Sequence, residues 1–310
     1  MPAGSDIAAI VGPTATGKSA IAEVAAERFD AAVISVDSMQ VYREMDIGTA
    51  KPSLEIRSRV DYRMIDVSDP QLDVSVQAFQ ELARNHLENL LAKERRVIIA
   101  GGSGLHFRAI VDPMTFAPTD STVRARIDAF DDADARSRLV GFDATVHEHV
   151  DMANPRRVVR ALEIFELTGE TPSHRAASSE RSAVKSYTPR YGFGAIGIDA
   201  GDDARDRVAG RLTSMIDRGL LSEVARLRGR LGAAASQAVG YKELVPVLDG
   251  TYDLAEGIER TRSATIALVK RQRTFFRRDP RIVWLAWQDD EHQRIANGVE
   301  MIGEMMRWNS

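Results

Sequence analysis

The stretch IAAIVGPTATGKS at residues 7–19 decides the fold, because it joins a short apolar run to a glycine-containing turn and a lysine. The apolar run is typical of a buried strand. A segment with helical character follows, from about Lys18 to Arg28. A strand, a glycine-containing turn and a helix in this order predict a loop that cradles phosphate.

The turn fits the pattern G-x-x-x-x-G-K-[ST]. Its glycines let backbone N–H groups point toward one place, and the helix N-terminus adds positive potential there. Lys18 can reach phosphate oxygens and Ser19 can hold Mg²⁺, so we expect Mg²⁺ as a cofactor. The motif indicates phosphate without indicating ATP, and no N-K-x-D guanine-reading motif accompanies it. The candidate phosphate-binding residues are Gly12, Pro13, Thr14, Ala15, Thr16, Gly17, Lys18 and Ser19.

Further apolar runs alternate with helical patterns along the chain. We expect strands at residues 32–36, 63–67, 97–100, 195–198 and 282–285, with helices at 75–93 and 205–218 among others. This alternation predicts an α/β fold with a P-loop NTPase-like parallel sheet covered on both faces.

The pattern changes between residues 118 and 186, where no buried strand is evident and helical periodicity dominates. Val158, Leu162 and Phe165 repeat as a core stripe of one such helix. We therefore expect residues 1–117 and 187–310 to form the catalytic core, and residues 118–186 to form a small all-helical insertion.

The composition is that of a globular protein, with 44% apolar and 28% charged residues among 310. The absence of cysteine excludes disulfides and thiolate zinc sites. The first apolar run is too short to span a bilayer. We expect a cytoplasmic monomer with no membrane partner and no obligate protein partner.

The charge distribution bears on a nucleic-acid partner. The net charge of −4 argues against one. However, residues 120–151 carry eight acidic and four basic residues, whereas residues 260–281 carry eight basic residues and one acid. This unevenness suits a protein with one basic face for a polyanion. A charge run alone is more typical of a solvated helix face.

The segments DSMQVYR at residues 37–43 and MDIGTAKP at 45–52 resemble the signature of bacterial tRNA dimethylallyltransferases, also called tRNA isopentenyltransferases. Matching blocks appear in the family's order from residue 12 to about 278. Departures from the pattern are Ser103 for Thr, His106 for Tyr, Phe275 for Trp, and Pro155 for an Asp that commonly follows Asn154. The further blocks are residues 12–19, 101–105, 157–163, 239–243 and 270–275.

The resemblance implies transfer of a dimethylallyl group from dimethylallyl diphosphate to the N6 amine of the adenosine 3′-adjacent to the anticodon of tRNA. Asp37 would take the amine proton, as it follows a strand at the sheet edge where ligands bind. A Walker B magnesium ligand is the alternative for Asp37. The residues 12–19, Ser103 and Arg211 would stabilise the leaving diphosphate. Arg207, one turn away, is either a second ligand or a surface arginine.

The resemblance also implies that four residues lie beside the flipped adenine, namely Ser38, Met39, Gln40 and Tyr42. Helical spacing places Lys270, Arg273 and Arg277 on one face and Val269 and Phe276 on another, and the basic face suits tRNA phosphates. The further candidates for holding the tRNA are Arg156, Arg157 and Arg160 at the insertion.

Three other functions remain open from the sequence. They are an adenine-nucleotide isopentenyltransferase of the cytokinin type, a P-loop kinase for a small metabolite, and a non-catalytic RNA-binding module. The basic stretch at 260–281 and the helical insertion favour tRNA over a mononucleotide, and the set of Lys18, Ser19 and Asp37 favours catalysis.

Overall fold

A computed structural model describes residues 6–308, and the chain divides into two compact units. The core unit comprises the chain up to Val111 and from Tyr191 onward, and the helical unit comprises Asp112–Arg190. The helical unit is therefore wider than the expected residues 118–186. The segment before residue 119 belongs to it because Arg160 donates hydrogen bonds to the carbonyls of Ala117 and Pro118.

The core unit contains one six-stranded parallel sheet, in the order β3-β2-β4-β1-β5-β6. In the centre, Ala8 of β1 pairs with Ile98 of β4 on one side and Gly194 of β5 on the other. The sheet confirms the predicted α/β class. The strands are β1 (Ile7–Val11), β2 (Ala31–Ser35), β3 (Tyr62–Arg63), β4 (Arg96–Gly101), β5 (Gly194–Gly197) and β6 (Ile282–Trp284).

The expectation of a strand over residues 63–67 is wrong beyond its first residue. Met64 and Asp66 have positive φ angles of 66° and 57°, which a strand does not allow. Asp66 instead turns toward the side chains of Lys51 and Arg57, with which it forms ion pairs. Tertiary contacts therefore end β3 after two residues.

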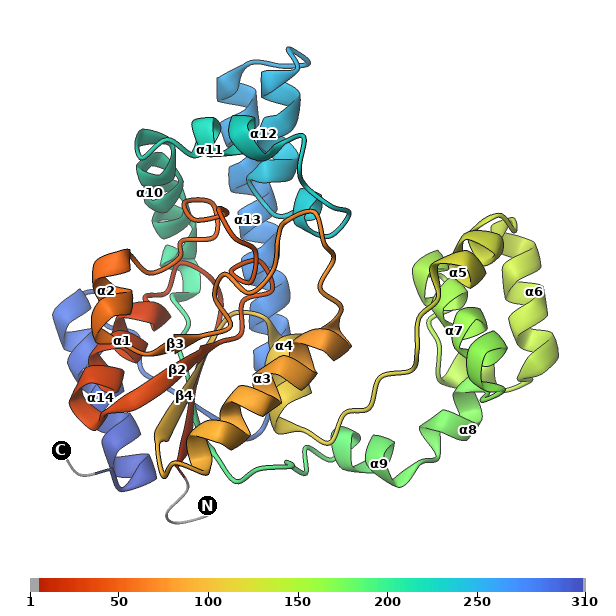
Figure 1. The fold of residues 1–310 in the computed structure, drawn as a ribbon, viewed down its shortest axis with the longest axis horizontal. Coiled ribbons are helices and arrows are strands. Elements are labelled where there is room, and N and C mark those ends of the chain that lie inside the picture. Colours follow the sequence, from red (N-terminus) through yellow and green to blue (C-terminus); the bar gives the residue numbers. More distant parts are fainter. Residues whose placement is uncertain (1–5, 309–310) are drawn as a thin grey trace. The chain divides into compact units, whose positions relative to one another are not determined.

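Helices cover both faces of the sheet (Figure 1). Residues alternate along β1, so Ala8 and Ile10 pack with α1 (Lys18–Phe29) and α14 (Glu291–Met306). Ile7, Ala9 and Val11 pack in the core that includes α3 (Val76–Leu91) and α4 (Gly104–Val111). The four central strands, β1, β2, β4 and β5, are thus buried on both sides.

The remaining helices of the core unit include a group that packs together. As expected, Val208, Leu212 and Met215 form the buried stripe of α10, whereas Ile216 is half-buried. These helices are α10 (Ala204–Asp217), α11 (Leu220–Leu227), α12 (Tyr241–Leu248) and α13 (Leu254–Phe276). The short elements are α2 (Leu54–Arg59) and the 3₁₀ turns Gly201–Asp203 and Ala235–Gln237.

The helical unit has its own apolar core, which contains Ile127, Leu139, Val158 and Leu162. Phe165 is half-buried and stacks on Phe142, with 4.2 Å between the ring centroids. Residues 112–190 form helices and no strand. These are α5 (Ser121–Asp128), α6 (Asp132–Phe142), the 3₁₀ turn Val146–Glu148, α7 (Pro155–Thr168), α8 (Pro172–Ala176) and α9 (Ser179–Lys185).

Membrane insertion through a helix has no support in the part of the chain that the structure describes. None of its helices combines the length and the apolar character that a membrane span requires.

Candidate active site

The loop after β1 has the geometry that its sequence predicts. Gly12 and Gly17 have positive φ angles of 140° and 86°, which favour glycine. A Cβ atom on Gly12 would lie 2.1 Å from the carbonyl oxygen of Ile198, so no other residue fits there. Thr16 Oγ1 donates to the carbonyl of Pro13 at 3.0 Å and braces the turn.

Lys18 lies inside this loop. Its ammonium donates to the carbonyl of Pro13 and to Thr16 Oγ1, the latter at 3.5 Å. Burial and the nearby charge of Arg211 lower the pKa of Lys18 to about 7, although the Asp37 carboxylate opposes this shift. Near neutral pH the amine is therefore poised between its charged and uncharged forms.

Asp37 and Arg211 face the same place as Lys18. Asp37 Oδ1 accepts the backbone N–H of Met39 at 2.9 Å, which fixes the carboxylate just beyond β2. Burial lowers the pKa of Arg211, and Asp37 acts in the opposite direction. The side chain of Arg211 makes no hydrogen bond or ion pair with the described residues. Its guanidinium can therefore bind an anion.

Two neighbouring cavities meet at Asp37, Arg211 and Thr14. The smaller, of about 80 Å³, is also lined by Lys18 and by Ser19, whose side chain is exposed. The larger, of about 250 Å³, has an apolar wall. Together they suit a substrate that joins an anionic group to an apolar one. The apolar wall contains Val208, Leu212, Met215, Leu220 and Leu268.

Ser103 lies beside this region without lining either cavity. Its backbone N–H donates to the carbonyl of Val36 at 3.1 Å, and its Oγ lies 2.7 Å from His106 Nδ1. Burial lowers the pKa of His106 to about 4, so its ring is neutral near pH 7. His106 packs edge-on against Phe79 and thereby fixes the partner of the Ser103 hydroxyl.

Arg207 contacts the phosphate loop from outside the cavities. Its Nε donates to the carbonyl of Ala15 at 2.8 Å, and its guanidinium lies 5.2 Å from the ring centroid of Trp287. The guanidinium of Arg294 also lies over the Trp287 ring, 4.4 Å from its centroid. This placement makes Arg207 a brace of the loop.

The residues expected beside the adenine fall into different places. Ser38 and Met39 line the larger cavity. Gln40 uses its amide within the protein, because Oε1 accepts Ser35 Oγ at 2.8 Å and Nε2 donates to the carbonyl of Thr49 at 3.1 Å. Tyr42 is buried in the core, where its hydroxyl accepts the N–H of Val74 at 3.2 Å.

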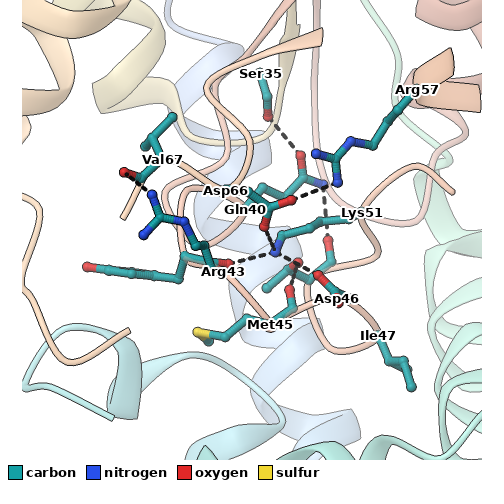
Figure 2. Close-up of polar contacts among 12 residues, drawn as sticks. Ser35, Gln40, Arg43, Met45, Asp46, Ile47, Lys51, Arg57, Asp66 and Val67 are labelled. Atoms are coloured by element: carbon teal, nitrogen blue, oxygen red, sulfur yellow. Dashed lines mark hydrogen bonds and ion pairs between the residues drawn. The ribbon is translucent and has the colours of Figure 1, made fainter. Parts of the chain in front are cut away.

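A buried lysine holds the segment that follows Gln40, as Figure 2 shows. Lys51 Nζ lies 2.8 Å from Asp46 Oδ1 and 2.6 Å from Asp66 Oδ1, and it donates to the carbonyl of Tyr42 at 2.6 Å. Arg57 pairs with the second oxygen of Asp66 at 2.7 Å. These ion pairs anchor one end of the turn that lines the cavities.

The basic residues of α13 and its C-cap, Arg277, are not equivalent. Val269 and Phe276 are buried, as expected for the apolar face. Arg273 and Arg277 both form ion pairs with Asp199. Its Oδ2 lies 2.8 Å from Arg273 Nε and 3.4 Å from Arg277 Nη2. Burial would raise the pKa of Asp199, but the two arginines lower it.

Lys270, in contrast, is exposed and makes no hydrogen bond or ion pair through its side chain with the described residues. It is the member of the expected trio that can meet an external phosphate without giving up a partner.

Sequence reasoning missed two neighbours of these residues. Gln272 Oε1 accepts the backbone N–H of Thr14 at 2.8 Å, and its side chain lies against Gly102. Arg271 lines the larger cavity. Both belong to the block at 270–275 that carries the family resemblance, which was the available signal.

In the helical unit, Arg156 and Arg157 are exposed, and Arg157 lies 3.4 Å from Asp151. Arg160 has an internal role, because it pairs with the buried Glu163 and donates to Ala117 and Pro118. This unit also contains a cavity of about 490 Å³. Its lining includes the basic residues His174, Arg175 and Arg181, which the sequence did not single out.

The core unit has a parallel sheet with a glycine-containing phosphate loop after β1 and a carboxylate after β2, the next strand along the chain. These features define a P-loop NTPase-like protein of the phosphate-binding class. The family model described as IPP transferase matches residues 40–279. The chain belongs to this family.

Relatives match nearly the whole chain. A tRNA dimethylallyltransferase from Pseudarthrobacter chlorophenolicus is 39% identical over 300 residues, which cover 94% of this chain and 97% of the relative. A tRNA dimethylallyltransferase from Acidothermus cellulolyticus is 41% identical over 288 residues, which cover 90% of this chain and 88% of the relative. The family resemblance inferred from the motifs is thus confirmed.

Solved structures agree with this assignment. The tRNA isopentenylpyrophosphate transferase of Bacillus halodurans superposes with a TM-score of 0.70 at 31% identity, covering 97% of this chain and 96% of its own. A eukaryotic dimethylallyltransferase acting on tRNA has a TM-score of 0.75 at 22% identity, and the match covers 90% of this chain and 73% of that chain. The latter supports the fold alone. The predicted P-loop NTPase-like fold is confirmed.

Proposed function

We propose that this protein transfers a dimethylallyl group from dimethylallyl diphosphate to the N6 amine of the adenosine 3′-adjacent to the anticodon of tRNA. The observation that carries the proposal is the pair of joined cavities in which Lys18, Asp37 and Arg211 meet an apolar wall. Family membership supports the same reaction.

The leaving group is diphosphate, which takes the electron pair of the broken carbon–oxygen bond. Lys18, Arg211 and the backbone N–H groups of the phosphate loop provide positive potential for it. Ser19 offers a hydroxyl oxygen in the same cavity, so Ser19 and the diphosphate oxygens would hold Mg²⁺ there. When bound, Mg²⁺ would neutralise part of the diphosphate charge.

Asp37 acts as the general base. The lone pair of N6 forms the new carbon–nitrogen bond, and the proton that N6 then loses passes to the free oxygen of the carboxylate. The Met39 N–H bond holds Asp37 Oδ1 in place and leaves Oδ2 for this transfer. The apolar wall holds the prenyl group and limits the access of water.

Two further residues support the diphosphate site from outside the two cavities. We assign Ser103 a hydroxyl contact to the donor that His106 orients, since their side chains are hydrogen-bonded. We assign Arg207 to the support of Ala15 in the phosphate loop.

On the tRNA side, Ser38 and Met39 contact the adenine, and Gln40 holds the segment that presents them. Lys270 and the exposed Arg156 and Arg157 contact RNA phosphates. The arrangement requires no partner subunit, so we propose a monomer that acts on tRNA in the cytoplasm.

The test is incubation with labelled dimethylallyl diphosphate and either bulk tRNA or AMP, followed by nucleoside analysis. We expect label on N6 of adenosine in tRNA and none on AMP. Equal or faster labelling of AMP would support the adenine-nucleotide transferase. Phosphate transfer from ATP to a small metabolite would support the kinase instead.

A further inference from the structure

The turn at residues 46–48 directs three successive backbone N–H groups at one carboxylate. Glu223 Oε2 accepts the N–H of Asp46 at 3.0 Å and that of Ile47 at 2.8 Å. Glu223 Oε1 accepts the N–H of Gly48 at 3.0 Å. Successive N–H groups of this kind form a concave anion site, and here a side chain of α11 fills it.

Tyr241 completes the arrangement from the first turn of α12. Its hydroxyl donates to Glu223 Oε1 at 2.6 Å, and both side chains are buried. Burial and the Glu223 charge raise the pKa of Tyr241, so the hydroxyl keeps its proton. A Cβ on Gly48 would lie 2.5 Å from the Tyr241 ring, so the ring also packs directly on the turn.

The turn leads by hydrogen bonds to the reacting carboxylate. The carbonyls of Thr49 and Ala50 accept Gln40 Nε2 at 3.1 and 3.3 Å. Gln40 Oε1 accepts Ser35 Oγ, which in turn accepts the N–H of Asp37 at 3.4 Å. Gly48 and Thr49 also line the larger cavity beside Asp37.

We propose that Glu223 and Tyr241 are positioning residues for prenyl transfer, which hold the 46–48 turn and thereby the geometry of Gln40 and Asp37. Neither residue lines either cavity or contacts the phosphate loop, so their effect should fall on turnover and tRNA use. Binding of diphosphate should not depend on them. The inference rests on the proposed function.

The chemistry of the site allows sharp substitutions. Glu223→Gln keeps the shape but replaces one acceptor oxygen with an NH₂ group, so at least one of the four donors loses its partner. Tyr241→Phe removes a single donor and keeps the ring on Gly48. Tyr191→Phe is the matched control, because Tyr191 donates to Glu88 at 2.6 Å and lines neither cavity.

The experiment measures kcat, the KM for tRNA, the Kd of inorganic diphosphate and the melting temperature of each variant. We expect kcat/KM for tRNA to fall about 10²-fold in Glu223→Gln, as for a displaced catalytic group. In Tyr241→Phe it should fall about tenfold, as for a lost hydrogen bond to a charged group. The diphosphate Kd should stay at the wild-type value in both, and Tyr191→Phe should match wild type in kcat/KM.

Two results would overturn the inference. One is a folded Tyr241→Phe variant with wild-type kcat/KM, whatever its melting temperature, because the pair would then serve stability alone. The other is a parallel loss of diphosphate affinity. If Glu223→Gln does not fold, Tyr241→Phe decides. Failure of the proposed function would show separately, as absence of tRNA prenylation by the wild-type enzyme.

Discussion

The loops that follow β1 and β2 both line the site, but they are held in different ways. The phosphate loop is held chiefly from within, by the positive φ of its glycines and by bonds from Thr16 and Lys18 to Pro13. The segment after β2 also has local bonds, from Gln40 to Thr49 and from Lys51 to Asp46, but its turn at residues 46–48 is held by a distant helix. Glu223 binds Asp46 across 177 residues of sequence.

This difference separates two ways of encoding a site. A loop held by its own residues is specified by a short motif and can be transferred or recognised as a unit. A loop held by distant helices depends on the whole core unit. The chemistry at Asp37 should therefore be more sensitive to remote substitutions than the binding of diphosphate.

The largest effect should come from Asp37→Asn. The amide cannot take a proton, so we expect kcat to fall by roughly 10²-fold or more, while affinities for tRNA and diphosphate stay unchanged. Asparagine Oδ1 can still accept the Met39 N–H, so the loop should keep its shape. Single-turnover rates at several Mg²⁺ concentrations provide the measurement. Partial rescue by Mg²⁺ would identify Asp37 as a metal ligand instead.

The phosphate loop should respond to pH through Lys18, whose pKa is lowered to about 7 by burial and Arg211. Below pH 7 the amine is already charged. Above pH 7 it must take up a proton to pair with diphosphate, because the bound anion raises its pKa.

The advantage of wild type over Lys18→Met in diphosphate affinity should thus be greatest below pH 7. It should then decrease by up to about tenfold per pH unit above it. Calorimetric titrations of both proteins from pH 6 to 9 test this, and the variant corrects for ionisation of diphosphate itself. A ratio that stays constant across this range would refute the assignment.

Gln272 connects the phosphate loop to α13, so it tests how self-contained that loop is. Gln272→Leu removes the acceptor for the Thr14 N–H and should cost roughly 1 kcal/mol, which weakens diphosphate binding about fivefold. Gln77→Leu, at an exposed bond to Glu81, is the control. Tighter binding in Gln272→Leu would mean that Gln272 competes with the ligand for Thr14.

The smallest effect concerns the basic face of α13. Lys270→Ala should reduce the slope of log affinity for tRNA against log salt by about 0.7–0.9 without changing the melting temperature. Arg273→Ala should lower the melting temperature, because the buried Asp199 loses its nearer partner. Identical behaviour of the two variants would contradict the division of roles.

The sequence predicted the elements that rest on local patterns. The phosphate loop, the parallel sheet and the helical character of the insertion follow from apolar periodicity and a short motif. The prediction of a strand at residues 63–67 was wrong because Asp66 turns to form an ion pair with Lys51, and apolar periodicity gives no information about that contact.

Site residues divide along the same line. Lys18, Ser19, Asp37 and Arg211 line the cavities where the motifs placed them. The structure alone shows that Arg207 is bonded to Ala15, which lies 192 residues away in the sequence. It likewise places the Tyr42 ring in the core and Arg273 on Asp199. Side-chain contacts between distant segments depend on the folded structure, and they cannot be predicted from the patterns of a single sequence.

The central place of β1 has a consequence for synthesis on the ribosome. β1 pairs with β4 and with β5, and the whole helical unit lies between those two strands in the sequence. The sheet around the phosphate loop can therefore close only after residue 197 has left the exit tunnel. The apolar core of the helical unit is formed by residues between 127 and 162, so its contacts are closer in the sequence. This unit should therefore fold before β5 has been synthesised and can pair with β1.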